Sequence, residues 1–186
     1  ARAKDETLYT ADTWEALQNA ISEAEGVILD ENATPEAVAE QLTKLDAAVA
    51  GLVKKPADTK ALTDALAELE GRDLTQYTDE TVQDLNAAVQ EAQDLLAQNP
   101  GIDDQELVNQ KLDALNNAVD GLVKKPADTK ALADKLAEAQ GKDLTSYTDE
   151  TAGALKEAIQ AAKDLLAQNP TIDAQEQVNQ KLEALN

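Results

Sequence analysis

The sequence of 186 residues contains no cysteine and no histidine. These absences exclude disulfides, thiol nucleophiles and the two commonest protein ligands of zinc and copper. They also exclude a nucleophile paired with a histidine base, and a serine–lysine pair has only Ser22 and Ser146 to draw on. We therefore expect no catalytic residues and no metal-ligating residues in this chain.

Aromatic residues make up only 2% of the chain, and phenylalanine and methionine are absent. The seven glycines are scattered among expected helix ends and turns, so no glycine-rich phosphate-binding loop is present. No stretch approaches the roughly 20 apolar residues that a membrane-spanning helix needs, and no signal peptide is visible. The sequence thus predicts no cofactor-binding residues, no cofactor and no membrane insertion.

Positive charge is scarce, because 16 lysines and arginines stand against 37 acidic residues and give a formal net charge of -21. Such a surface repels phosphate backbones and anionic lipid, so we expect no nucleic acid partner and no anionic membrane partner. The same charge favours solubility and discourages self-association, which predicts a monomer.

One apolar pattern occurs three times, beginning at Tyr9, Tyr77 and Tyr147. In each copy the apolar residues follow one another at spacings of three and four, which places them on one face of a helix. In the central copy, residues 77–98, they are Val82, Leu85, Val89, Ala92 and Leu96. Each copy therefore predicts an amphipathic helix.

The start of this helix carries its own signals. Thr78 can cap the first turn through its hydroxyl, and Tyr77 and Val82 have the spacing of a hydrophobic staple. In the other copies the staple partner is Trp14 or Ala152. We interpret Trp14 as a core residue at a helix start rather than as an exposed ligand-stacking platform.

The first repeat continues with a second helix. Residues 1–8 are expected to be frayed, and the helix from about Ala11 to Leu29 is broken by residues 30–34. Thr34-Pro35-Glu36 begins the next helix as cap, first-turn proline and first-turn acid. Gly51 is expected to end that helix in the left-handed conformation.

The later repeats add a short helix before the long one. Leu62, Leu66 and Leu69 share one helical face, with Asp58 or Thr59 as the expected cap. A third helix of the second repeat is expected after residues 103–106, which have the spacing of a capping box.

Internal repetition is the strongest feature of the sequence. Residues 57–116 and 127–186 align without gaps and are identical at 42 of 60 positions. The segment GLVKKPADTKAL occurs letter for letter at residues 51–62 and 121–132. A fixed period of 70 residues indicates an array of similar units, each long enough for three helices.

The array predicts an all-α fold of tandem antiparallel three-helix bundles arranged end to end as an elongated rod. We expect a partial first repeat at residues 1–55, a complete repeat at 56–124, and a third repeat at 125–186 that is truncated in its last helix. Asn186 aligns with Asn116 inside a helix, which suggests a fragment of a longer array. A frame that groups each short helix with the two helices before it remains open.

The helix pattern resembles a known family. In the first repeat the pattern comprises Tyr9, Thr10, Thr13, Trp14, Leu17 and Ala20, and then T-P-E-A-V and L-x-x-A-V-x-x-L between Thr34 and Leu52. Together with the preceding short helix of the later repeats, this resembles the FIVAR module, "found in various architectures". The second and third repeats depart from it at the tryptophan.

The resemblance implies small three-helix modules within large multidomain proteins that Gram-positive bacteria secrete or anchor in the cell wall. Surface adhesins and secreted carbohydrate-active enzymes are among the implied hosts. The resemblance implies a spacer or interaction role, and no catalytic residue carries over from it.

Charged residues give no site of their own. The acidic pairs Asp79–Glu80, Asp103–Asp104 and Asp149–Glu150 fall in the first turns of expected helices, where they suit the helix dipole. Neither residues 30–32 nor residues 100–104 match a calcium loop. The lysine pairs at 54–55 and 124–125 are interpreted as solvated linker charge, or alternatively as a hinge contact to an acidic surface.

These observations favour a non-catalytic stalk or spacer in an extracellular bacterial protein of the cell wall, the cell surface or the secreted fraction. Its expected partners are neighbouring domains of the same polypeptide. The alternative is an adhesin module that recognises a host protein or glycan through its helix faces. We do not expect an enzyme.

Overall fold

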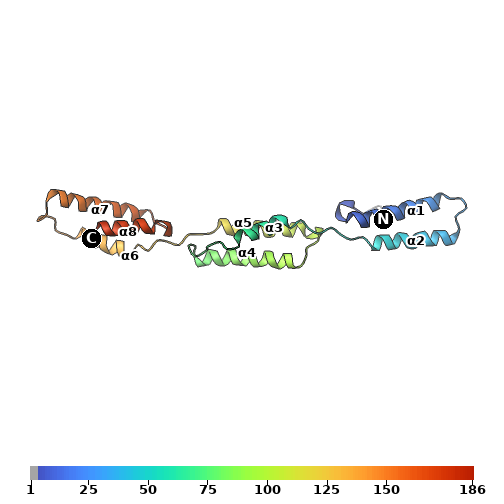
Figure 1. The fold of residues 1–186 in the computed structure, drawn as a ribbon, viewed down its shortest axis with the longest axis horizontal. Helices are drawn as coiled ribbons and strands as arrows, with labels where there is room; N and C mark the ends of the chain where they lie inside the picture. The colour runs from blue at the N-terminus through green and yellow to red at the C-terminus, as the bar shows by residue number, and fades with distance from the viewer. Residues whose placement is uncertain (1–3) are drawn as a thin grey trace. The chain divides into compact units, whose positions relative to one another are not determined.

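The computed structural model describes residues 4–186, so the first three residues of the expected first repeat lie outside the description. This part of the chain forms eight α-helices and three 3-10 helices, and its only β-type pairings are isolated bridges. The helices are α1 (Ala11–Leu29), α2 (Pro35–Ala50), α3 (Lys60–Leu69), α4 (Asp79–Ala97), α5 (Gln105–Asp120), α6 (Lys130–Gln140), α7 (Asp149–Ala167) and α8 (Gln175–Ala184), with η1 (Glu6–Leu8), η2 (Ile102–Asp104) and η3 (Ile172–Ala174). The predicted all-α fold class is confirmed (Figure 1).

The chain divides into two compact units. The first comprises residues 1–70 and 88–116, and the second comprises residues 71–87 and 117–186. The division falls inside helices α4 and α5, so each unit contains one of the two identical VKKPAD segments.

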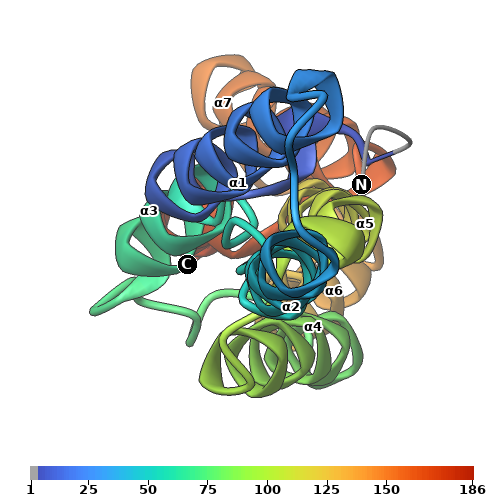
Figure 2. The ribbon, with the colours of Figure 1, turned by 90° about the vertical axis from the view of Figure 1, so that its right-hand side faces the viewer.

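In the first unit, α1 and α2 pack against each other as an antiparallel hairpin (Figures 1 and 2). Leu17 on α1 is fully buried, as its place on the apolar face requires. The Thr34 hydroxyl accepts a hydrogen bond from the Ala37 N–H at 3.2 Å, and Pro35 occupies the first turn. The expected start of α2 is therefore confirmed.

In the second unit, α6 contacts both α7 and α8, and these two helices contact each other. Their apolar faces enclose one core to which each helix contributes buried side chains. The buried residues are Ala127, Leu132, Leu136, Ala139, Ala162, Leu165, Val178 and Leu185. Burying these side chains is the main favourable term that holds this part of the chain together.

Two local expectations were wrong. Gly51 ends α2 with φ -82° and ψ 0°, a right-handed conformation, because its N–H bonds back to the Ala47 and Val49 carbonyls within the last turn. Residues 6–8 are not frayed, because the Asp5 carboxylate accepts from the Thr7 N–H and caps η1. The left-handed residues after long helices are instead Asn99 (φ 50°) and Asn169 (φ 48°).

The side chain that caps this turn is Asp104 rather than Glu106. The Gly101 N–H donates to Asp104 Oδ2 at 3.0 Å, and the Asp104 N–H donates to the Gly101 carbonyl at 2.8 Å. Glycine has no side chain to accept the reciprocal bond, so η2 carries half of a capping box, closed by Asp104 two residues before the expected Glu106. This shift leaves the Asp103 carboxylate available for another partner.

Candidate functional site: the junction segments

The two VKKPAD segments, residues 53–58 and 123–128, are called the junction segments from here on. Each follows a long helix and precedes a short one. Proline at 56 and 126 has no N–H and disfavours helical backbone in the residue before it, so the chain cannot remain helical there. The segments are extended and leave their remaining backbone groups available for other partners.

On its first side, the first junction segment bonds to the residues just before α1. The Thr10 N–H donates to the Val53 carbonyl at 2.8 Å, and the Lys55 N–H donates to the Leu8 carbonyl at 2.9 Å. The Val53 N–H donates to Thr13 Oγ1 at 3.2 Å. Tyr9 lies in the antiparallel bridge that these bonds form with Lys54, and it is buried.

On its second side, the same segment bonds to the loop before α5. The Ala57 N–H donates to the Pro100 carbonyl at 2.9 Å, and the Ile102 N–H donates to the Lys55 carbonyl at 2.8 Å. The Gln105 amide closes the contact, because its oxygen accepts from the Asp58 N–H at 2.6 Å and its nitrogen donates to the Asp58 carbonyl at 3.1 Å.

The second junction segment repeats the first-side bonds. Thr78 N–H donates to the Val123 carbonyl at 2.8 Å and Lys125 N–H to the Gln76 carbonyl at 2.8 Å, while the Val123 N–H donates to Thr81 Oγ1 at 3.2 Å. An identical sequence therefore makes the same contacts twice.

Its second-side bonds are also repeated. The Ala127 N–H donates to the Pro170 carbonyl and the Ile172 N–H to the Lys125 carbonyl, both at 2.8 Å. The Gln175 amide bonds to Asp128 as Gln105 bonds to Asp58. Its oxygen accepts from the Asp128 N–H at 2.7 Å, and its nitrogen donates to the Asp128 carbonyl at 3.1 Å. Each segment thus carries hydrogen bonds on both of its sides.

Ion pairs reinforce both junctions. Lys54 pairs with Asp103, and Lys124 pairs with Asp173. The hydrogen bond to the partner carboxylate raises the pKa of each lysine above its ordinary value. In the second junction, Lys125 also lies 3.4 Å from an Asp79 oxygen. Lys54, Lys124 and Lys125 therefore contact carboxylates of this chain, although their side chains remain 48%, 38% and 40% exposed.

Tyr9 and Tyr77 lie opposite Lys54 and Lys124 of the junction segments. The rings of Tyr9 and Trp14 stack with centroids 6.2 Å apart and planes inclined by 12°, as the staple spacing predicted. Trp14 is half-buried, and the guanidinium of Arg72 lies 5.9 Å from the Tyr77 ring centre.

The acidic pairs that the sequence singled out all lie at the starts of helices. The acidic pairs at 79–80 and 149–150 lie in first helical turns, and the pair at 103–104 lies in η2. Within residues 4–186, no group of three or more acidic side chains converges as a metal site would require. Asp30 instead accepts a hydrogen bond from the Asn32 N–H of its own turn.

The sequence reasoning missed the threonine and glutamine contacts. Thr13 and Thr81 follow the first residue of their helices by two positions, and Gln105 and Gln175 begin theirs. The sequence shows that these threonines and glutamines recur at equivalent positions of the repeats. Many residues on exposed helix faces recur in the same way, so recurrence alone does not distinguish the contact residues. The register of the junction segments against other loops was therefore needed to single them out.

The FIVAR domain model matches residues 3–53, 58–123 and 128–186. The first two matches end at residue 53 and at Val123, where the junction segments begin. A comparison with solved structures finds no match. No helix among residues 4–186 is long and apolar enough to cross a membrane.

Proposed function

The chain belongs to the FIVAR family, and on that premise we propose that it is a non-catalytic stalk or spacer in a large bacterial cell-surface or secreted protein. In this proposal the chain is an extracellular monomer whose partners are the neighbouring domains of its own polypeptide. It carries no catalytic, cofactor-binding or metal-binding residue, and it is not an enzyme.

The observation that supports this role most directly is the repetition of the junction contacts. Two segments 70 residues apart make the same seven hydrogen bonds and the same ion pair. A net contribution of about 1 kcal/mol per hydrogen bond makes each junction a substantial contact. A spacer built from repeats needs the same connection between each repeat and the next. The two junction segments make such a repeated connection.

We further propose the domain boundaries 1–55, 56–124 and 125–186, with each short helix grouped with the two longer helices that follow it. The packing of α6 against both α7 and α8 supports this frame. The complete unit is then a three-helix bundle, and the first and third repeats are partial versions of it. The other frame would assign α6 to the helices before it.

Small-angle X-ray scattering of residues 1–186 tests the spacer proposal. Bundles arranged in line, built on helices of about 30 Å, should give a radius of gyration of roughly 25–30 Å. A single compact domain of this length should give roughly 16 Å. The smaller value would contradict a spacer, because repeats that fold back on one another cannot separate other domains.

The adhesin alternative is supported by a specific surface. Ile28 on α1 and Val38 and Leu42 on α2 line one surface hollow, and they are 77%, 49% and 60% exposed, which is unusual for large apolar side chains that lie close together. Saturable micromolar binding of a host protein or glycan, lost when Leu42 is replaced by glutamine, would establish a binding role. Absence of binding to a panel of matrix proteins and glycans would leave the spacer role alone.

A further inference from the structure

The three equivalent tyrosines differ in exposure. Tyr9 is 8% exposed, Tyr77 is half-buried, and Tyr147 is 58% exposed. The neighbouring threonines follow the same trend, because Thr10 and Thr78 are half-buried whereas Thr148 is exposed. The Tyr-Thr pair is therefore covered by other residues in the first two repeats and exposed to solvent in the third.

A leucine–valine–lysine–lysine segment contacts the two covered sites. At Tyr77 it comprises residues 122–125, whose backbone bonds to Gln76, Thr78 and the Thr81 hydroxyl. At Tyr9 it comprises residues 52–55, with equivalent bonds. Leu52 and Leu122 are half-buried there, while the valines point outward and are 54% and 55% exposed.

The third site retains the groups that receive such a segment. The Thr148 hydroxyl bonds to the Thr151 hydroxyl at 2.9 Å, as Thr78 bonds to Thr81 at 3.0 Å in the second site. Asp149 stands at the position of Asp79, the carboxylate beside Lys125. The backbone conformation before the helix is also conserved, because the Thr145 N–H donates to Asp143 as the Thr75 N–H does to Asp73.

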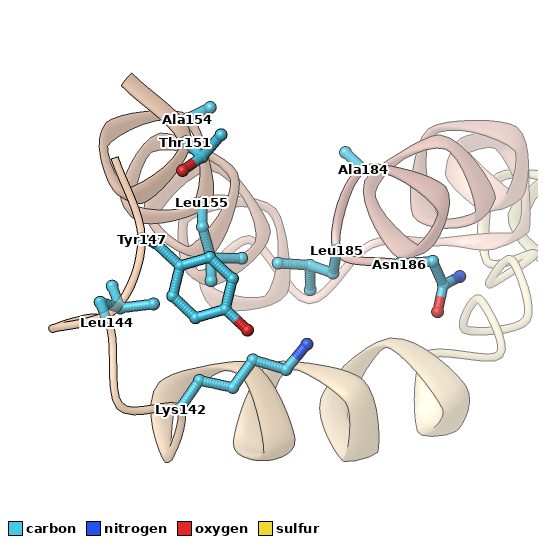
Figure 3. A pocket seen from close by; sticks show the side chains of 9 residues that line it. All are labelled: Lys142, Leu144, Tyr147, Thr151, Ala154, Leu155, Ala184, Leu185 and Asn186. Atoms are coloured by element: carbon cyan, nitrogen blue, oxygen red, sulfur yellow. The ribbon is translucent and has the colours of Figure 1, made fainter. Parts of the chain in front are cut away.

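A cavity of about 390 Å³ lies beside these groups. Figure 3 shows the ring of Tyr147 next to Leu144 and Leu155, with Leu185 directed towards the same space and Lys142 along its lower edge. Lys142 holds the position of Arg72, which lies over the Tyr77 ring in the second site. The cavity thus combines an apolar floor with a rim of hydrogen-bonding groups.

We propose that this cavity is a binding site for an extended Leu-Val-Lys-Lys segment connected to the C-terminal side of α8. In the register of the second site, the first lysine lies opposite Tyr147 in an antiparallel bridge, and the valine carbonyl accepts from the Thr148 N–H. The valine N–H donates to Thr151 Oγ1. The backbone N–H of the second lysine donates to the Ser146 carbonyl, and its side-chain ammonium group pairs with the Asp149 carboxylate. The two lysines also complement a chain of net charge -21.

The test is an extension of the whole chain after Asn186 by the nine residues of Asn117–Lys125, NAVDGLVKK. Burial of the backbone bonds should protect the Thr148 amide from hydrogen exchange at least tenfold more than in the original chain. The Tyr147 ring signals should shift at the same time. Unchanged Thr148 exchange and unchanged Tyr147 signals would overturn the proposal.

The control extension keeps NAVDG and replaces the last four residues by Gly-Ser-Ser-Gly, because a longer α8 alone could stabilise the third repeat. A second variant, Thr151→Val in the NAVDGLVKK chain, removes the hydroxyl acceptor while keeping the side-chain volume. We expect the control and Thr151→Val to lose most of the protection. Equal protection in all three chains would show that helix extension, and not the segment, causes the effect, and would also overturn the proposal.

Discussion

At the scale of single residues, the paired lysines show how an extended segment divides its contacts. Successive side chains of an extended chain point to opposite sides. In the second junction, Lys124 accordingly contacts Asp173, which follows the segment in the sequence, and Lys125 contacts Asp79, which precedes it. In the first repeat Ala11 stands where Asp79 stands in the second, so Lys55 has no equivalent carboxylate at that position.

We predict that the pKa of Lys124 in the folded chain lies above its ordinary value of 10.5, because the Asp173 carboxylate stabilises its charged form. The raised value means that the stabilisation is complete below pH 10.5 and is lost as pH rises through the folded pKa. An NMR titration of the lysine side chains measures this directly. Asp173→Asn should return the Lys124 pKa to the ordinary value, whereas Asp103→Asn should leave it unchanged.

At the scale of helices, the short helix decides how much of its neighbours is buried. Val178 on α8 is 2% exposed in a core that α6 completes, and Val108 on α5 is also 2% exposed. Val38 occupies the matching position of α2 and is 49% exposed. The three helices have similar sequence patterns, so the difference comes from what covers them.

We predict that Val108→Ala lowers the free energy of unfolding by about 2 kcal/mol, because it removes buried methyl groups and leaves a cavity. The matched change Val38→Ala should alter the stability by less than about 0.5 kcal/mol, because the lost contacts are few and alanine favours the helix. Urea unfolding followed by circular dichroism measures both. Equal losses would mean that Val38 is covered in solution.

At the scale of the whole molecule, charge repulsion opposes folding. The acidic residues exceed the basic ones by 21, since 37 stand against 16. The ion pairs that offset this are largely exposed to water, so each contributes little to the stability. Because carboxylates outnumber lysines and arginines in this way, their mutual repulsion should outweigh the attraction within the ion pairs.

We therefore predict that raising sodium chloride from about 10 mM to about 500 mM increases the melting temperature, because the Debye length falls from roughly 30 Å to a few ångströms. An effect on the order of 1 kcal/mol corresponds to a rise of roughly 2–8 °C. Differential scanning calorimetry with an equally osmolal sugar as the control measures it. A fall in melting temperature would show that the ion pairs dominate instead.

The helices and the repeat could be predicted from local signals in the sequence. Spacings of three and four, Thr34-Pro35 and the prolines of the junctions are local signals, so α1, α2 and α3 could be predicted nearly to the residue. The identity of 42 of 60 positions also established the array without any structure. Helix propensity, capping and periodicity act between residues that are close in sequence, which is why they can be read from it.

The contacts of the junction segments could be identified only in the folded chain. The Gln105–Asp58 and Lys54–Asp103 contacts join residues 47 and 49 positions apart, and their register depends on how a loop and an extended segment meet. Asp103 pairs with that lysine, while the Asp104 carboxylate accepts from the Gly101 N–H and closes η2. Contacts of this kind depend on packing between distant segments, and no periodicity in the sequence encodes them.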